Sequence, residues 1–176
     1  IRDLVRSRGL GDVYKRQIDN FQNIYEIKWL NMMRDKLGLF GEDKNDLELI
    51  NNLYNWMQSN KADYTNTFCY LMNISSIQDQ IYKDKDFIDW SKNWEKRILI
   101  NGGSKENSLE LMKKNNPIVI PRNHKVEEVL EAANNNDLKP MYELLSILKK
   151  PYTKQINIEK FQTPSNNQNY QTFCGT

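Results

Sequence analysis

Apolar side chains recur every three or four residues along most of this chain, which is the spacing that places them on one face of a helix. The first such run covers residues 18–37 and predicts a long helix. Gly38 follows directly and is the residue type that most often ends a helix. The apolar positions of this predicted helix are Phe21, Ile24, Tyr25, Trp29 and Met32.

A second apolar run predicts a helix that begins at Asn45 or Asp46. Asn45 and Glu48 have the spacing of a capping box, in which the side chain of each residue accepts the backbone N–H of the other. A third, shorter helix is predicted after Asp63. The side chains expected to face inward are Leu47, Ile50, Leu53, Tyr54 and Met57 in the second helix and Phe68, Leu71 and Met72 in the third.

Two tryptophans, Trp90 and Trp94, share one face of a further predicted helix with Phe87 and Ile98. Large aromatic residues at helical spacing are typical of core anchors, and we favour that interpretation over a platform for a ligand. The pair Gly102 and Gly103 is predicted to end this helix as a turn. Ser104 is then expected to cap the next helix, which contains Leu109 and Met112.

Residues 116–121 are predicted to be extended, because Pro117 and Pro121 each disfavour a helical conformation in the preceding residue. Asn123 is expected to cap a following helix, and Asp137 to cap one more. Pro140 falls in the first turn of that last helix, where a missing N–H costs little. The predicted stripes are Val126, Val129, Leu130 and Ala133, then Leu138, Met141, Leu144, Leu145 and Leu148, before Pro151.

The helical pattern decays after Tyr152, and residues 153–176 are rich in Asn, Gln and Thr. We therefore predict a mainly α fold in three parts. Residues 1–17 form an atypical opening segment, residues 18–152 a helical region, and residues 153–176 an irregular tail that ends in Cys-Gly-Thr.

The opening segment carries most of the positive charge. The chain has a formal net charge of +2. Residues 1–17 hold five basic and two acidic side chains, so the remaining 20 basic and 21 acidic side chains give a net charge of −1. Because a nucleic-acid surface requires a basic face on the folded body, we do not expect nucleic-acid binding.

The segment 1–17 also resembles translated sequencing-adapter sequence, and we interpret it as non-native. The alternative is a native basic helix or arm. No stretch approaches the roughly 18 apolar residues of a membrane-spanning helix, so no membrane association is expected.

Known catalytic motifs are missing from the sequence. We find no phosphate-binding loop, no G-x-G-x-x-G, no H-E-x-x-H, no C-x-x-C and no H-R-D or D-F-G triplet. The only histidine, His124, follows Arg122 and Asn123 at a predicted helix start. These residues either contact a phosphate or a substrate there, or stabilise the corner by hydrogen bonds to neighbouring backbone. We favour the structural interpretation for Pro117, Pro121, Arg122, Asn123 and His124.

The chain has two cysteines, too few for a disulfide framework or a zinc site. Cys69 lies within an apolar helix and is predicted to be a small buried hydrophobic residue. Cys174 lies in the polar tail, as the third residue from the end, where its thiol is open to exchange. From chemistry alone, a redox role and an incidental cysteine are equally good interpretations of Cys174.

Several separated motifs resemble one family. From residue 116 the chain reads N-P-I-V-I-P-R-N-H-K-V-E-E-V-L-E-A-A, and from residue 136 N-D-L-K-P-M-Y-E-L-L-S-I-L-K-K-P-Y. Together with K-L-G-L at residues 36–39, A-D-Y-T-N-T-F at residues 62–68 and the closing Y-Q-T-F-C-G-T, these motifs resemble the C-terminal region of the selenoprotein O (SelO, YdiU) family. The resemblance covers residues 18–176.

The resemblance implies a protein-kinase-like (pseudokinase) fold that transfers AMP from ATP to hydroxyl side chains of proteins, with Mg²⁺ or Mn²⁺. The family's nucleotide-binding and catalytic motifs lie upstream and do not occur here, so no catalytic, cofactor or metal residue is assigned. We expect the fragment alone to be inactive and to bind neither ATP nor metal. Its expected partner is the N-terminal kinase-like part of the same polypeptide, and the parent enzyme acts on protein substrates.

Cys174 matches the family's selenocysteine or cysteine near the C-terminus, which implies a redox bridge to an upstream cysteine. Cys69 does not match that partner. A bacterial member is expected in the cytoplasm, and a eukaryotic one in mitochondria. The alternative to a fragment of an adenylyltransferase is a self-contained helical module that binds a partner protein and has no enzymatic activity.

Overall fold

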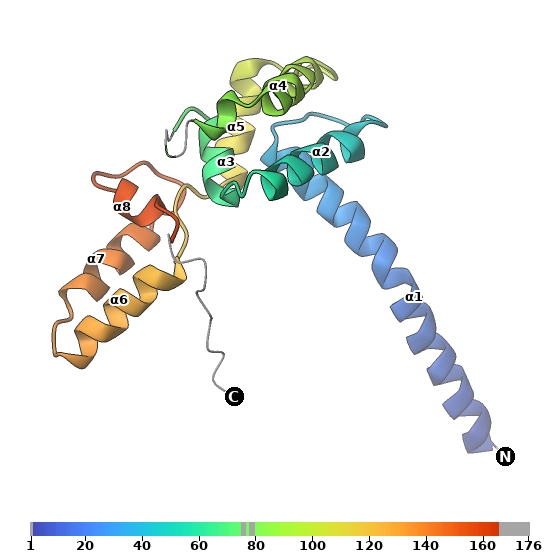
Figure 1. The fold of residues 1–176 in the computed structure, drawn as a ribbon. Coiled ribbons are helices and arrows are strands. Elements are labelled where there is room, and N and C mark those ends of the chain that lie inside the picture. Colours follow the sequence, from blue (N-terminus) through green and yellow to red (C-terminus); the bar gives the residue numbers. More distant parts are fainter. Residues whose placement is uncertain (1, 75–76, 78–79, 166–176) are drawn as a thin grey trace.

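The computed structural model describes residues 2–74, 77 and 80–165, and these residues form helices and no strand (Figure 1). The mainly α fold is thus confirmed. A 3-10 turn, η1 (Ile81–Lys83), precedes the fourth helix, and a short helix, α8 (Glu159–Gln162), follows the seventh. The other helices are α1 (Arg2–Lys36), α2 (Asp46–Ser59), α3 (Tyr64–Leu71), α4 (Lys85–Ile98), α5 (Lys105–Asn115), α6 (Asn123–Asn134) and α7 (Lys139–Leu148).

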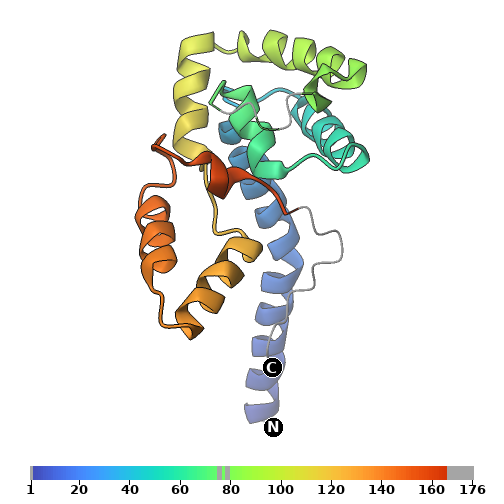
Figure 2. The same cartoon turned by 60° about the vertical axis from the view of Figure 1, so that its left-hand side comes forward.

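Helices α2, α3, α4 and α5 gather around the C-terminal end of α1 and form the body of the molecule (Figure 1). Two features extend from the same end of this body. One is the N-terminal part of α1, and the other is an antiparallel hairpin of α6 and α7 (Figures 1 and 2). In the view of Figure 1 the two diverge, and the α6–α7 hairpin is joined to the body through its two ends.

The core draws apolar side chains from α1 to α5, from η1 and from α7 and α8, but no residue of α6 is fully buried. Trp90 and Trp94 are both in this core, as predicted, and their rings stack at a centroid separation of 5.9 Å. Each indole N–H donates to a carbonyl oxygen, that of Leu49 at 2.8 Å and that of Leu37 at 2.9 Å. The tryptophans therefore anchor α4 to α2 and to the end of α1.

Helix α1 differs from the prediction in its start and in its buried face. It begins at Arg2, not near residue 18, and ends at Lys36, followed by Gly38 with a positive φ of 68°. The side chains that are fully buried at its C-terminal end are those of Met33 and Leu37. Most of the predicted apolar stripe is exposed, since only Trp29 packs against the core. The exposed members are Phe21, Ile24, Tyr25 and Met32.

The predicted helix caps are right in two cases. The Asp63 carboxylate accepts the backbone N–H of Asn66, and the Ser104 hydroxyl accepts that of Asn107. The capping box at Asn45 is wrong, because the Asn45 backbone is itself helical in conformation and its side chain makes no capping bond. Leu47 is correspondingly half exposed rather than inward.

The caps of α6 and α7 also differ from the prediction. Asn123 is the first residue of α6 and not its cap, a position held by Arg122 in an extended conformation. Asp137 precedes the cap residue of α7, Leu138, although its carboxylate accepts the backbone N–H of Lys139 at 3.0 Å. Pro140 lies in the first turn, as predicted.

Residues 116–121 lie outside any helix, as their two prolines predict, and the backbone of Asn116 is extended. The backbone N–H of Ile118 donates to the carbonyl oxygen of Pro151 at 2.7 Å, which ties this segment to the end of α7. The predicted irregular tail is wrong for residues 158–162, where α8 packs Ile158 and Phe161 into the core. Residues 166–176, which include Cys174, lie outside the described part of the chain.

Candidate functional site

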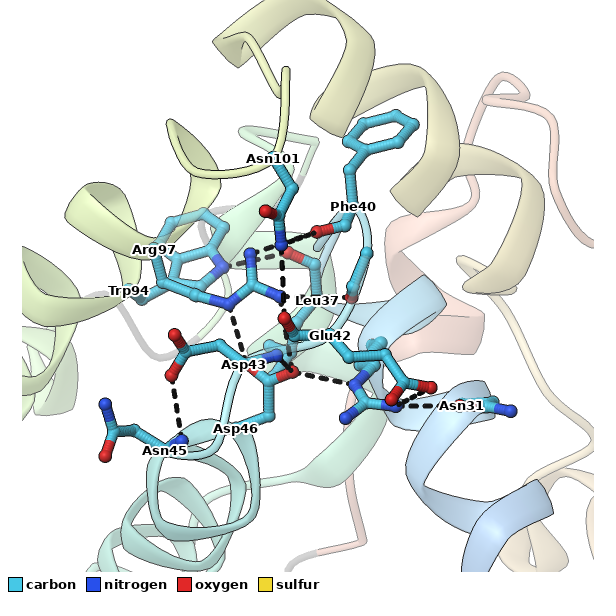
Figure 3. A network of polar contacts seen from close by, with 12 residues as sticks. Asn31, Leu37, Phe40, Glu42, Asp43, Asn45, Asp46, Trp94, Arg97 and Asn101 are labelled. Carbon is cyan, nitrogen blue, oxygen red and sulfur yellow. Dashed lines mark hydrogen bonds and ion pairs between the residues drawn. The ribbon is translucent and has the colours of Figure 1, made fainter.

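The most highly charged buried cluster is built around Asp46, the first residue of α2 (Figure 3). Its side chain is fully buried and lies between two arginines from different helices. Arg34 of α1 donates through Nε at 2.7 Å, and Arg97 of α4 through Nε at 2.6 Å and Nη2 at 3.2 Å. We call these three residues the Asp46 cluster. They join α1, α2 and α4 at one point.

The Asp46 cluster also holds the loop that connects α1 to α2. Arg97 donates to the carbonyl oxygens of Phe40 and Gly41, each at 3.1 Å, and the Asn101 amide donates to the carbonyl oxygens of Phe40 and Glu42 (Figure 3). Gly41 has a φ of 61°, and a Cβ there would lie 2.8 Å from the Asn101 amide nitrogen. Glycine is therefore required for this close approach.

Burial by itself would raise the pKa of the Asp46 carboxyl, because it disfavours the charged form. Hydrogen bonds from Arg97, from the Asp43 backbone and from Arg34 outweigh this effect, and the pKa lies below its ordinary value. Asp46 is thus held as a carboxylate. It accepts hydrogen bonds and neither releases nor takes up a proton near neutral pH. A cleft of about 310 Å³ lies beside the cluster and is lined in part by Asn45, Asn52 and Lys96.

A second polar contact joins α3 to the start of α6. The guanidinium of Arg122 donates to both carboxylate oxygens of Asp63, at 2.7 and 2.9 Å, and both side chains are largely buried. The partner of Arg122 is thus a side chain 59 residues away, not the neighbouring backbone that we expected. Since Asp63 also caps α3, one carboxylate positions both helices.

The remaining residues of the motif around Arg122 lie close to this contact. Pro117 and His124 are half-buried, whereas Pro121 and Asn123 are exposed. Burial, followed by the positive charge of Lys125, lowers the pKa of His124. The imidazole is therefore neutral near pH 7. The structural role that we assign to these residues stays a prediction.

Cys69 of α3 is fully buried, as predicted. Burial, followed by the negative charge of Asp63, raises the pKa of its thiol to about 11. Since the thiolate is the reactive form of cysteine, Cys69 is a poor nucleophile at neutral pH. Its neighbour Lys36 lies over the Phe68 ring at 4.6 Å, and burial lowers the pKa of its ammonium group.

Within residues 2–74, 77 and 80–165, no group of three or more His, Cys, Asp or Glu side chains is placed to hold a metal ion. Nor is any helix in this part of the chain long and apolar enough to cross a membrane.

Sequence reasoning found Asp63 and Arg122 separately but missed the Asp46 cluster altogether. Its members are 12 and 51 residues apart along the chain, and each taken alone is an ordinary charged residue of a helix. The one local signal is that Arg34 and Arg97 occur near the C-terminal ends of their helices. Basic residues are common there because they interact favourably with the helix dipole, so the signal does not point to a buried cluster.

Comparisons with known proteins agree with the motifs in the sequence. A family model described as protein adenylyltransferase SelO matches residues 10–149. A protein nucleotidyltransferase YdiU from Pelagibacter ubique is 50% identical over 161 residues, which are 90% of this chain and 33% of the relative. YdiU proteins from Nitrosococcus oceani and Bacillus thuringiensis are 43% and 42% identical over 90% and 91% of the chain. The chain spans about a third of the length of these relatives.

Proposed function

The chain belongs to the SelO family of protein adenylyltransferases, and from this we propose that it is the helical C-terminal part of a longer enzyme that transfers AMP from ATP to hydroxyl side chains of proteins. In this proposal ATP and Mg²⁺ or Mn²⁺ are bound by the preceding, kinase-like part of the parent. The present chain packs against that part and completes its fold.

The observation that carries this proposal is the extent of the family match, which runs from α1 to the end of α7 without a nucleotide-binding motif. The chemistry of the buried polar groups agrees with a structural role. The carboxylate of Asp46 is neutralised by two arginines, and that of Asp63 by Arg122. A buried carboxylate that is already paired with arginines is not free to act as a metal ligand or a general base, and its removal would leave the arginines buried without a counter-charge.

Isothermal titration calorimetry of residues 1–176 with ATP, in the presence of Mg²⁺ or Mn²⁺, tests the division of labour. We expect no heat of binding from the chain alone. The intact Pelagibacter ubique relative serves as the comparison. Micromolar binding of ATP by the chain alone would contradict the proposal. The activity itself is tested by joining the preceding two thirds of that relative to residues 18–176 and measuring AMP incorporation into protein by mass spectrometry.

We further propose that Cys174 forms a disulfide with a cysteine of the preceding part of the parent. The raised pKa of buried Cys69 supports an upstream partner over Cys69. Non-reducing mass spectrometry of the joined protein should find a bridge that dithiothreitol breaks and that Cys174→Ser removes. A bridge between Cys69 and Cys174 in the chain alone would contradict this pairing.

The second candidate function is a self-contained helical module that binds a partner protein. One observation favours it, because the chain has a continuous core that includes residues from α1 to α8. Such a module should be monomeric and should melt in one cooperative transition. A fragment with an uncovered apolar face should self-associate instead. Light scattering coupled to size-exclusion chromatography distinguishes the two.

A further inference from the structure

Helix α1 carries an exposed row of large apolar side chains beyond the body of the molecule. Ile18, Phe21, Tyr25 and Met32 are 73%, 66%, 57% and 46% exposed. Together with Trp29 they recur at intervals of three and four residues, so they lie on one side of the helix. We call these five residues the α1 stripe.

The α1 stripe is a separate face of the helix from the one that contacts the body. The body-facing residues are Met33 and Leu37, which are fully buried and lie on a neighbouring face. Trp29 connects the two, because its ring packs at a centroid distance of 6.0 Å from that of Tyr54 in α2. The stripe therefore continues the existing core outward along α1.

A row of this length is larger than the single exposed apolar residues that occur on ordinary surfaces, and contiguous apolar patches mark contact sites. All five positions lie within residues 10–149, the range that the family model matches, so this part of α1 is covered by the family resemblance. They also lie outside the atypical segment 1–17.

We propose that the α1 stripe is the surface on which the preceding part of the parent enzyme packs. This inference rests on the proposed function, since it takes the occupant to be the other two thirds of the same polypeptide, a length that the relatives possess and this chain does not. In the proposed parent that polypeptide precedes α1 in the same chain. A short covalent link gives an effective concentration of about millimolar, which a second copy of the chain does not reach at ordinary protein concentrations.

The matched control for this surface is Ile27, which is 60% exposed on the same helix. Its position in the helical repeat places it on the side opposite the stripe. The side chains of Phe21 and Ile27 are similarly exposed on the same helix, and cysteines placed at the two positions lie on opposite faces of it.

The test is thiol labelling of Phe21→Cys and Ile27→Cys with N-ethylmaleimide, followed by mass spectrometry of the α1 peptide. Each variant is made in the chain of residues 1–176 and in the joined protein that contains the preceding two thirds of the Pelagibacter ubique relative. We expect the joined protein to slow labelling at Phe21→Cys by about tenfold or more, and to leave Ile27→Cys unchanged. Tyr25→Cys provides a second position on the stripe.

Equal labelling rates at Phe21→Cys and Tyr25→Cys in the two proteins would overturn the proposal. So would protection in the chain alone that rises with its concentration, because a second copy would then be the occupant. AMP incorporation by the joined protein is measured in the same preparations. If the joined protein is active while the stripe stays accessible, the docking inference fails and the proposed function stands. If the stripe is protected but no AMP is incorporated, the docking inference stands and the proposed activity fails.

Discussion

At Asp46 a single carboxylate compensates two arginines in a place that water barely reaches. Desolvating three charges is costly, and the cost is offset only while each charge keeps its partner. Glu42 also contacts Arg34, at 3.3 Å, but its side chain is 79% exposed and contributes little. Removing one member of the Asp46 cluster is therefore expected to destabilise the fold, because the other charges stay buried without their partner.

Replacing Asp46 by Asn should lower the free energy of unfolding by about 3 kcal/mol, because Arg34 and Arg97 then stay buried without a counter-charge. Urea unfolding followed by circular dichroism measures the change. Glu42→Gln is the control and should leave the midpoint nearly unchanged. A loss for Asp46→Asn no larger than that of the control would show that the cluster contributes nothing to stability.

The same carboxylate predicts how stability depends on pH. Since the pKa of Asp46 is lower in the folded chain than in the unfolded one, its contribution is complete above the unfolded pKa of about 4 and is lost as the pH falls through the folded value. The difference in urea midpoint between the unmodified chain and Asp46→Asn should therefore shrink between pH 6 and pH 3. A difference that is constant over this range would contradict the assignment.

Among the elements, α8 has only four residues and yet it closes the core on the side of α3. The Gln162 amide donates to the carbonyl oxygen of Ile118 at 2.7 Å, and the Gln162 carbonyl accepts from Asn66 at 3.0 Å. Phe161 adds a side chain that is only 6% exposed. The four residues of α8 thus connect residues 116–121 to α3. So short a helix is not stable in isolation, and these contacts with the rest of the chain stabilise it.

Truncating Phe161 to Ala should lower the free energy of unfolding by about 3 kcal/mol, through lost burial and the cavity that remains. Ile156→Ala removes an apolar side chain of the same tail that is 88% exposed, and it should have almost no effect. Thermal melts of both variants make the comparison. If the two variants melt alike, the tail does not take part in the core.

Across the whole molecule, burial is distributed unevenly. Helix α4 buries five side chains, whereas α6, of similar length, buries none. The α6–α7 hairpin is held mainly by α7, through Leu144 and Ile147, and by residues 116–121, which lead into α6. Elements with few buried apolar contacts open locally at a lower free energy than the rest of a fold.

Amide hydrogen exchange should therefore be faster in α6 than in α4, by about an order of magnitude or more at neutral pH. The two helices are of comparable length, so the expected difference comes from the number of buried side chains and not from helix length. Exchange followed by mass spectrometry of peptides resolves them. Equal protection in α4 and α6 would mean that the hairpin and the body unfold as one unit.

Much of this architecture follows from local rules. The spacing of Phe87, Trp90 and Trp94 predicts their helix and its buried face, and Asp63 and Ser104 cap the helices that they precede. The rules fail where a long-range partner competes. Asn45 does not form its capping box, because the adjacent Asp46 accepts the backbone N–H of Asp43 and anchors the turn to two arginines.

The sequence by itself determined the helical class, most helix boundaries and membership of the family, because periodicity, caps and motifs are local or linear properties. Only the tertiary structure decided which faces are buried and which charges meet. The amphipathic pattern of α1 is the same whether its stripe faces this body or another one, and only the packed structure shows that Ile18, Phe21, Tyr25 and Met32 are uncovered. Likewise, Arg34, Asp46 and Arg97 become one cluster only when three helices meet.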